Sequence, residues 1–189
     1  MREKFGIDES TLIVGHVGCF NDQKNQTYLV KIFNKLLEFN NNSKLVLVGD
    51  GSKINEVKQL AKDLGLEEKV LFFGNVNNVN DVLQMMDVMC LPSLYEGLPL
   101  VVVEWQISAL PSVISNTVTT ECAYTDIVKY MSLSDDEEKW AKAIIEMSNV
   151  DRKAIMDDVI ELTRINGFDI NENAENLQSL LKELVNERR

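Results

Sequence analysis

The sequence predicts an α/β fold, namely a Rossmann-like, doubly wound parallel sheet of about six strands flanked by helices. Short apolar runs typical of buried strands alternate along most of the chain with stretches that have helical periodicity. Turns that contain glycine follow several of these runs, and α/β sheets bind ligands where their strands end. The chain has 189 residues, of which 45% are apolar, which is enough for one core. We therefore expect a single domain.

The first half of the chain is predicted to alternate strand and helix. In the helical stretches apolar residues return every three or four positions, which places them on one face. Gly65 is expected to end the second helix, because glycine tolerates the left-handed backbone found at helix C-termini. The expected elements are a strand over 12–18, a helix over 25–40, a strand over 44–48, a helix over 53–64, a strand over 70–73, a helix over 79–86 and a strand over 88–91.

The second half is predicted to end in helices. A helix over 99–109 precedes two further strands, which are expected over 112–114 and near 127–131. From there to the end the pattern is helical, with Gly167 as the clearest break. Ser134 is expected to cap the first of these helices, because the acidic residues that follow it complement the helix dipole.

The C-terminal segment, residues 168–189, is predicted to form a helix with an apolar face. The regular part of this helix is expected over 171–186. An apolar surface left exposed on the isolated chain is expected to make it prone to self-association. The apolar residues of this face are Leu177, Leu180, Leu181, Leu184 and Val185.

The composition argues against several classes of function. A net charge of −11 disfavours binding to nucleic acid or to anionic membrane surfaces, since either needs a basic patch. No apolar run reaches the length of a membrane span, and no signal peptide is expected. The three cysteines are widely spaced and fit no metal-ligand pattern, so reduced thiols of a cytoplasmic protein are expected. The single histidine, His16, lies at the end of an apolar strand and is expected to be a packed side chain rather than a metal ligand.

The most informative stretch of the chain runs from Pro92 to Glu104. A buried strand ends just before it, a turn with Gly97 follows, and a helix begins near Pro99, where the missing N–H of proline is tolerated. Free main-chain N–H groups and the helix dipole favour a negatively charged ligand at such a point. Glu96 and Glu104 bracket the turn. The stretch therefore predicts a site for a diphosphate with hydroxyl groups on either side.

Four motifs in this order resemble those of the family 4 glycosyltransferases, enzymes of the GT-B fold that take a sugar from a nucleotide diphosphate sugar. Glu96 and Glu104 stand at the spacing of the family's donor-site signature. The similarity covers residues 12–140. It implies that residues 1–189 are a single domain, one GT-B half, namely the C-terminal donor-binding domain without the N-terminal acceptor-binding domain. The other motifs are residues 14–20 with 23–25, residues 44–51 and residues 70–76.

The resemblance implies a role for each charged residue of the site. Glu96 would contact the donor sugar near its reacting end and Lys24 would lie on the pyrophosphate, which makes them the candidate catalytic residues. Glu104 would accept hydrogen bonds from the ribose hydroxyl groups. The alternatives are that Glu104 faces solvent and that Lys24 is an ordinary exposed lysine.

Smaller residues and main-chain groups are implied to bind the rest of the donor. The amides of Gly97, Leu98 and Leu100 would donate to phosphate oxygens. Gly18 would let the backbone approach the departing phosphates closely. The remaining candidate donor-binding residues are Asn75 and Val76, which would frame the nucleotide base, and Ser93, which would bind a phosphate or sugar or merely cap the turn.

Two residues depart from the family pattern. Cys19 stands where the family usually carries arginine, so a bidentate cation for the diphosphate is missing. Trp105 lies in a helix that usually carries small residues, and it would either crowd the pocket or pack on a neighbour. These departures weaken the expectation of full activity and leave the fold assignment unchanged.

The expected function is that of the donor domain of a retaining, metal-independent glycosyltransferase in bacterial surface polysaccharide synthesis, of the capsule or exopolysaccharide type. The resemblance implies a nucleotide diphosphate sugar as substrate, most simply a UDP-sugar, and no cofactor. The expected partners are this donor and the N-terminal acceptor domain, with no nucleic acid. The expected location is the cytoplasm, with peripheral contact at the inner face of the membrane. Alone, the chain is expected to be inactive, because transfer needs donor and acceptor in one closed cleft.

Three other interpretations stay open. The first is a degenerate nucleotide-binding or interaction module of the same fold, which Cys19 and Trp105 would permit. The second is a nucleotide-sugar epimerase of this fold, which would need further catalytic carboxylates and a histidine, and only His16 is available. The third is a dinucleotide-binding dehydrogenase. It is least favoured, because residues 15–18 lack the third glycine of the motif and no strand-end acidic residue stands in a convincing place.

Overall fold

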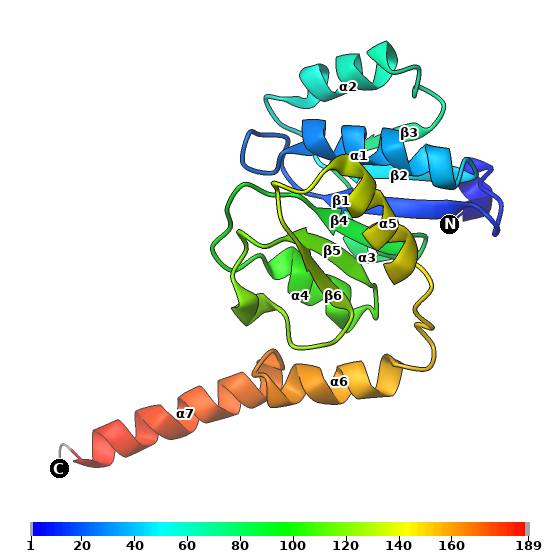
Figure 1. The fold of residues 1–189 in the computed structure, drawn as a ribbon. Coiled ribbons are helices and arrows are strands. Elements are labelled where there is room, and N and C mark those ends of the chain that lie inside the picture. The colour runs from blue at the N-terminus through cyan, green and yellow to red at the C-terminus, as the bar shows by residue number, and fades with distance from the viewer. Residues whose placement is uncertain (1, 188–189) are drawn as a thin grey trace.

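The computed structural model describes residues 2–187 and contains a six-stranded sheet in which all neighbouring strands are parallel (Figure 1). The strand order is β3-β2-β1-β4-β5-β6. This order confirms the predicted α/β fold with a doubly wound sheet. The strands are β1 (Leu12–Val17), β2 (Ser43–Val48), β3 (Val70–Gly74), β4 (Val88–Leu91), β5 (Ser112–Ser115) and β6 (Val128–Met131).

The chain changes its direction of travel across the sheet between β3 and β4. From β1 it passes outward through β2 to β3, and it then crosses back to β4 on the other side of β1. β1 and β4 pair only at Val14 with Val88 and at Gly15 with Met89, so their last residues are not joined by the ladder. In open α/β sheets such a switch point is where ligands bind.

Helices cover both faces of the sheet. They are α1 (Gln26–Phe39), α2 (Ile54–Asp63), α3 (Val79–Leu83), α4 (Leu100–Ile107), α5 (Glu137–Met147), α6 (Met156–Ile165) and α7 (Ile170–Glu187), with 3-10 turns η1 (Arg2–Phe5) and η2 (Thr120–Cys122). Successive strand residues point to opposite faces. Val14 therefore packs in the core under α1, α2 and α5, which includes Trp140, whereas Ile13 packs in the core under α3 and α4, which includes Trp105.

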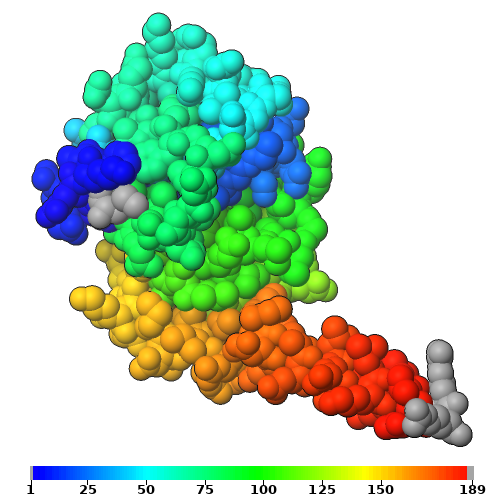
Figure 2. Space-filling model, turned by 180° about the vertical axis from the view of Figure 1, so that it is seen from behind, coloured from blue at the N-terminus to red at the C-terminus, as the bar shows by residue number. Residues whose placement is uncertain are grey.

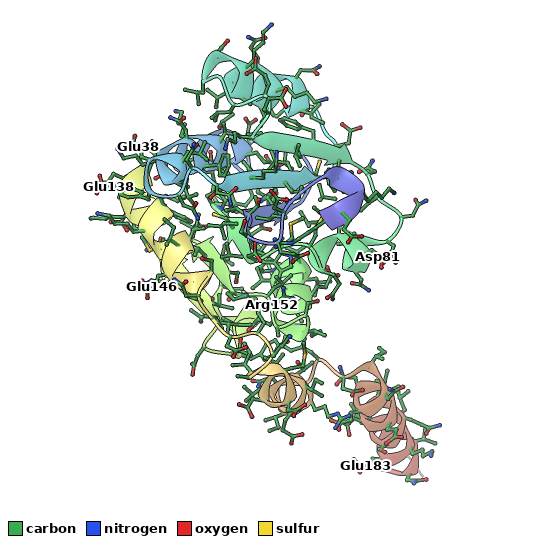
Figure 3. The ribbon with its side chains drawn as sticks, turned by 90° about the vertical axis from the view of Figure 1, so that its right-hand side faces the viewer. Glu38, Asp81, Glu138, Glu146, Arg152 and Glu183 are labelled. Carbon is green, nitrogen blue, oxygen red and sulfur yellow. The ribbon has the colours of Figure 1, made fainter. Side chains whose placement is uncertain are left out.

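α7 leads away from the rest of the molecule (Figures 1 and 2). Glu183, near its end, lies well apart from the sheet in Figure 3. Neither α7 nor any other helix of residues 2–187 is both long and apolar enough to cross a membrane. The apolar face predicted for this helix is exposed within the described chain, at 57% for Leu177, 51% for Leu180, 54% for Leu181, 46% for Leu184 and 57% for Val185. Self-association of the chain stays a prediction.

Most predicted elements are present, with ends shifted by one or two residues. The helix expected over 79–86 is the main error, because it ends at Leu83. The next residues form a turn, in which the Met86 amide donates to the Leu83 carbonyl at 3.1 Å. Gly65 and Gly167 end helices as predicted, with φ values of 69° and 76°.

Two features of the C-terminal helices differ from the prediction. Asp136, rather than Ser134, caps α5, since its carboxylate accepts a hydrogen bond from the Lys139 amide at 2.9 Å. A second break, over 148–155, separates α5 from α6. Of the segment predicted as 168–189, helix α7 begins at Ile170, and residues 188–189, like Met1, lie outside the described residues.

Arg152 holds together the amino edge of the sheet, the edge at which the strands begin. Its guanidinium donates to the main-chain oxygens of Met86 at 2.9 Å, Ser108 at 3.0 Å and Ala109 at 3.0 Å. These carbonyls precede β4 and β5. Ala109 has a φ of 48°, a left-handed backbone that is unusual for a residue with a Cβ. One side chain thus fixes two chain entries into the sheet.

Arg2, near the N-terminus, also holds together segments at the amino edge of the sheet. It donates to the main-chain oxygens of Met85 at 3.1 Å and Thr11 at 2.9 Å, and it pairs with Asp87 at 2.7 Å. Asp87 in turn accepts from the Ile13 amide at 2.7 Å, at the start of β1. The start of β1 and the start of β4 are therefore tied together.

Candidate functional site

The two candidate catalytic residues meet at the carboxyl edge of the sheet, the edge at which the strands end. Lys24 lies in the loop after β1 and Glu96 in the loop after β4, and the Lys24 Nζ to Glu96 Oε1 distance is 2.7 Å. Only 15% of the Lys24 side chain and 7% of the Glu96 side chain are exposed. An ion pair so little exposed is screened much less by water and salt than a surface pair.

Two neutral side chains complete the contacts of Glu96. Ser93 Oγ donates to Oε1 at 2.7 Å, and Gln23 Nε2 donates to Oε2 at 3.1 Å. Both carboxylate oxygens therefore have a partner, which holds the carboxylate in one orientation. Ser93 is completely buried, so its contact with the site runs through Glu96.

The loops that carry this ion pair are joined to each other. The Leu94 amide donates to the Gln23 carbonyl at 2.8 Å. Asn25 Nδ2 donates to the Pro92 carbonyl at 3.1 Å. Asn25 has a φ of 55°, and asparagine is one of the few residues that tolerate this left-handed backbone. The loops after β1 and β4 thus form one unit across the switch point.

His16 lies at this switch point and is completely buried. Its Nδ1 is 2.9 Å from the Cys90 carbonyl oxygen, and its Nε2 is 3.2 Å from Nε2 of Gln26. Burial lowers the pKa of His16 to about 4, so the imidazole is neutral near pH 7. The sequence-based expectation of a packed side chain is confirmed for this histidine.

Three candidate donor-binding residues line one cavity beside the ion pair. Gly18, Asn75 and Val76 border a space of about 350 Å³ at the carboxyl ends of β1, β2 and β3, together with Cys19. Gly49 also lines it, with a φ of 129°. A Cβ at Gly49 would lie 2.1 Å from the Gly18 carbonyl oxygen, so only glycine fits there.

The start of α4 is open to solvent. The N–H groups of Gly97, Leu98 and Leu100 make no hydrogen bond within the described chain. Leu98 and Leu100 are 45% and 61% exposed, and Glu104 is exposed one turn further along the helix. The free N–H groups and the helix dipole make this a suitable place for an anion.

The two departures from the family pattern have different outcomes. Trp105 is completely buried in the core under α3 and α4, so it packs on its neighbours and does not crowd the pocket. Cys19 is exposed and lines the cavity. A thiol at that position offers no permanent positive charge to a diphosphate.

A larger hollow of about 660 Å³ lies along β3, the strand at one end of the sheet. Phe5 stacks on Phe73 there, with ring centroids 4.6 Å apart. Val76 borders both spaces and is the only candidate donor-binding residue in this one. Because the larger hollow lies away from the switch point and from the Lys24–Glu96 pair, the smaller cavity is the better candidate site.

Four polar residues of the site were not predicted to belong to it. Gln23 and Gln26 follow the first strand, where their closeness to Lys24 was a usable signal. Ser115 and Thr117 donate to the Ser93 carbonyl at 2.5 and 2.8 Å, and support the Glu96 loop from the end of β5. Their sequence gives no local signal, since only the parallel pairing of β4 with β5 brings them there.

Comparison with known proteins gives a consistent result. The family model for glycosyl transferases group 1 matches residues 1–157. EpsF of Bacillus subtilis strain 168, whose name describes a glycosyltransferase, is 39% identical to this chain over 140 residues. The aligned residues cover 74% of this chain and 36% of EpsF. The Escherichia coli protein named UDP-Gal:alpha-D-GlcNAc-diphosphoundecaprenol alpha-1,3-galactosyltransferase is 27% identical over 190 residues, which cover 98% of this chain and 49% of that protein. The chain thus spans half or less of the length of these curated relatives.

The fold recurs in solved structures. The crystal structure of HepE from Anabaena in complex with UDP-glucose superposes with a TM-score of 0.71 at 20% identity. The match covers 94% of this chain and 51% of HepE. At this identity the likeness shows the fold, in which a six-stranded parallel sheet is flanked by helices.

Proposed function

This chain belongs to the glycosyl transferases group 1 family, and we propose that it is the donor-binding domain of an enzyme that moves a sugar from a nucleotide diphosphate sugar to a glycan or lipid-linked acceptor. The reaction belongs to bacterial surface polysaccharide synthesis, and a UDP-sugar is the donor. The name of the Escherichia coli relative and the UDP-glucose bound to HepE support this donor class. The observation that carries the proposal is the Lys24–Glu96 pair at the switch point, beside a cavity lined by Gly18.

In the proposed mechanism, Lys24 exchanges Glu96 for an oxygen of the donor diphosphate. As the bond between the sugar and the diphosphate breaks, negative charge grows on the leaving group. The Lys24 ammonium and the amides of Gly97 and Leu98 stabilise that charge in place of a metal ion. Glu96, still oriented by Ser93, accepts hydrogen bonds from the donor sugar, and the new bond retains the configuration of the sugar carbon.

The nucleoside occupies the remaining contacts. Glu104 accepts hydrogen bonds from the ribose hydroxyl groups, since an exposed carboxylate one turn into α4 lies close to the amides that bind the phosphates. Asn75 and Val76, on the loop after β3, frame the base at the cavity wall. No cofactor takes part.

The acceptor belongs to a second domain in this proposal. Transfer to an acceptor requires a closed cleft that excludes water, and the N-terminal domain of the complete enzyme supplies the other wall. The isolated chain therefore binds the donor without transferring its sugar. The enzyme works in the cytoplasm, where a lipid-linked acceptor brings it into peripheral contact with the inner face of the membrane.

A second candidate function rests on Cys19. Because this thiol lines the cavity where a family member usually carries arginine, the domain would be a degenerate nucleotide-binding or interaction module. Cys19→Arg separates the two. A gain of about tenfold in UDP affinity, or about 1.4 kcal/mol, supports a weakened donor site. An unchanged affinity supports the module.

Thermal unfolding of the chain with UDP, GDP, ADP and their sugars tests the proposed function. A diphosphate at about one hundred times its dissociation constant adds about 2.7 kcal/mol to the free energy of unfolding. We expect a selective shift with UDP and UDP-sugars. UMP, which lacks the second phosphate, is the matched ligand control and should give a smaller shift. If none of the diphosphates shifts the unfolding transition, the donor-binding role of this chain is contradicted.

A further inference from the structure

We propose that His16 and Gln26 are a positioning pair, which fixes the loop of residues 18–24 in the conformation that binds the donor diphosphate. The consequence for binding rests on the proposed function. The structural part, which concerns the loop itself, can be tested without any ligand.

His16 stands where the sheet opens. The β1–β4 ladder has its last pair at Gly15 and Met89, although both strands continue. One residue further, the His16 side chain reaches the Cys90 carbonyl oxygen at 2.9 Å. A side-chain hydrogen bond thus takes over from the main-chain ladder at the switch point, and both strand ends stay tied beside the site.

The hydrogen bonds of the pair can run in only one direction. A carbonyl oxygen only accepts, so His16 Nδ1 must carry the imidazole proton toward Cys90. Gln26 Nε2 is 2.9 Å from the Cys19 carbonyl oxygen and must donate one hydrogen there. Its second hydrogen goes to His16 Nε2, at 3.2 Å, which is the free acceptor of the neutral ring. A continuous chain of hydrogen bonds therefore joins β4 to the loop after β1.

This chain of hydrogen bonds fixes the peptide groups of the loop. The peptide group between Cys19 and Phe20 is held on both sides, by Gln26 at its carbonyl and by the Asp50 carbonyl, 3.0 Å from the Phe20 amide. The Gly18 amide is held by the Val48 carbonyl at 3.0 Å. The Cys19 amide between them makes no hydrogen bond within the described chain, and its residue lines the cavity. The loop thus presents a free N–H group in a fixed position.

Lys24 depends on the same support. A Cβ placed on Gly18 would lie 3.2 Å from His16 Nε2 and 3.3 Å from Lys24 Cε. The lysine side chain and the imidazole therefore pack against the same glycine. Movement of either the loop or the ring would displace the lysine stem and so the ammonium that the diphosphate needs.

Burial of the Gln26 side chain has an energetic cost, which the hydrogen bonds from its Nε2 offset. Its Oε1 atom is buried without a partner among the described residues. A buried unpaired oxygen destabilises a fold, so a purely structural position would favour an apolar residue. The two N–H donors are the contribution of a glutamine here that an apolar residue cannot match.

The test is Gln26→Glu, which removes both donors at almost the same volume. Gln106→Glu is the matched control, because Gln106 is equally buried and its amide donates to the Val102 and Cys122 carbonyls at 3.1 and 2.7 Å, far along α4 from the ion pair. Three measurements are made on each full chain: the ¹⁵N signals of the single imidazole, amide hydrogen exchange, and the dissociation constant of UDP.

In the unsubstituted chain we expect His16 to carry its proton on Nδ1 alone. In Gln26→Glu, the new carboxylate places a proton on Nε2, amide exchange over 18–24 becomes about tenfold faster, and UDP binds about tenfold more weakly. In Gln106→Glu, faster exchange is confined to residues near 120–125, and UDP affinity changes by less than about twofold. A merely structural role of Gln26 would not confine the faster exchange to 18–24 or weaken UDP binding.

The proposal is overturned if Gln26→Glu leaves exchange over 18–24 and UDP affinity unchanged. If the unsubstituted chain binds no nucleoside diphosphate, the proposed function fails. Amide hydrogen exchange in Gln26→Glu is then the only test of the positioning role. Faster exchange confined to residues 18–24 supports that role, and unchanged exchange contradicts it. Should Gln26→Glu fail to fold, Gln26→Met removes the donors without adding charge and gives the same two outcomes.

Discussion

The two edges of the sheet hold their cations in different ways. At the amino edge, the guanidinium of Arg152 donates to three main-chain oxygens. Arg2 donates to three more and pairs with Asp87. At the carboxyl edge, the ammonium of Lys24 has one strong partner, the carboxylate of Glu96. Both edges carry a positive charge that is not freely exposed, and in the proposed mechanism only the second cation exchanges its partner, for the donor diphosphate.

The partners of these cations separate a contribution to stability from a proposed role in binding. A main-chain carbonyl that loses a buried donor has no substitute, so Arg152 cannot move without a cost to the fold. Glu96 keeps hydrogen bonds from Ser93 and Gln23 when Lys24 turns to another anion.

Arg152→Ala should give the largest effect, at the amino edge. Three charge-assisted hydrogen bonds are lost, and we expect the free energy of unfolding to fall by about 4 kcal/mol in urea titrations. UDP affinity of the folded fraction should stay within about twofold. Lys153→Ala, at the exposed neighbour, is the control and should change stability by less than about 0.5 kcal/mol. A large loss of UDP affinity in Arg152→Ala would show that the edges are not independent.

His16 predicts a pH dependence of stability. Its pKa falls from 6.5 to about 4 on folding because of burial. Between these values the unfolded chain binds a proton that the folded chain excludes, so stability drops as the pH falls from 6.5 to 4, by about 3 kcal/mol, and no further below that. Urea titrations at pH 7.5 and 4.5 measure the drop. The His16→Gln variant should lack the part of the stability drop that comes from the histidine. An equal drop in both proteins would contradict the prediction.

Lys24→Met should separate binding from stability at the carboxyl edge. Loss of the cation should weaken UDP binding by about thirtyfold, or about 2 kcal/mol, in calorimetric titrations. Stability should fall by only about 1 kcal/mol, because Ser93 and Gln23 still bind Glu96. Lys31→Met, at an exposed position of α1, serves as the control. UDP affinity equal to that of the unsubstituted chain would remove Lys24 from the site.

Glu104→Ala should have the smallest effect, and only on binding. Loss of a ribose contact should weaken UDP binding about tenfold, or about 1.4 kcal/mol. The melting temperature should not change, because the side chain is exposed. The deoxyribose analogue of UDP tests the assignment, since it should lose less affinity than UDP on the same substitution. Equal losses for both ligands would contradict a contact with the ribose hydroxyl group.

The periodic parts of the molecule were predictable because their signal is local. The alternation of apolar runs with helical spacing specified all six strands, and Gly65 and Gly167 marked two helix ends through their left-handed backbone. Ser134 failed as a cap because Asp136 is equally suitable and lies closer to the helix start. The helix expected over 79–86 failed because apolar residues continue into a turn that periodicity does not distinguish.

The candidate site was predictable in part. Motif order placed Lys24 with Glu96, and the structure brings them to 2.7 Å. The same motifs gave no sign that Ser93 would be buried against Glu96, and they left open whether Trp105 would crowd the pocket or pack in the core. Each of those outcomes depends on which face of an element meets a neighbour from elsewhere in the chain.

The class of fold, the order of its elements and the type of chemistry at the ends of its strands followed from local signals, because periodicity, glycine turns and motif spacing are properties of neighbouring residues. Which polar groups contact one another depends on the folded arrangement of the whole chain. Gln26 finds His16 and the Cys19 carbonyl, and Arg152 finds the carbonyls before β4 and β5, only once the crossovers bring distant segments within about 3 Å. Hydrogen bonds have that short range, so no spacing along the chain can specify them.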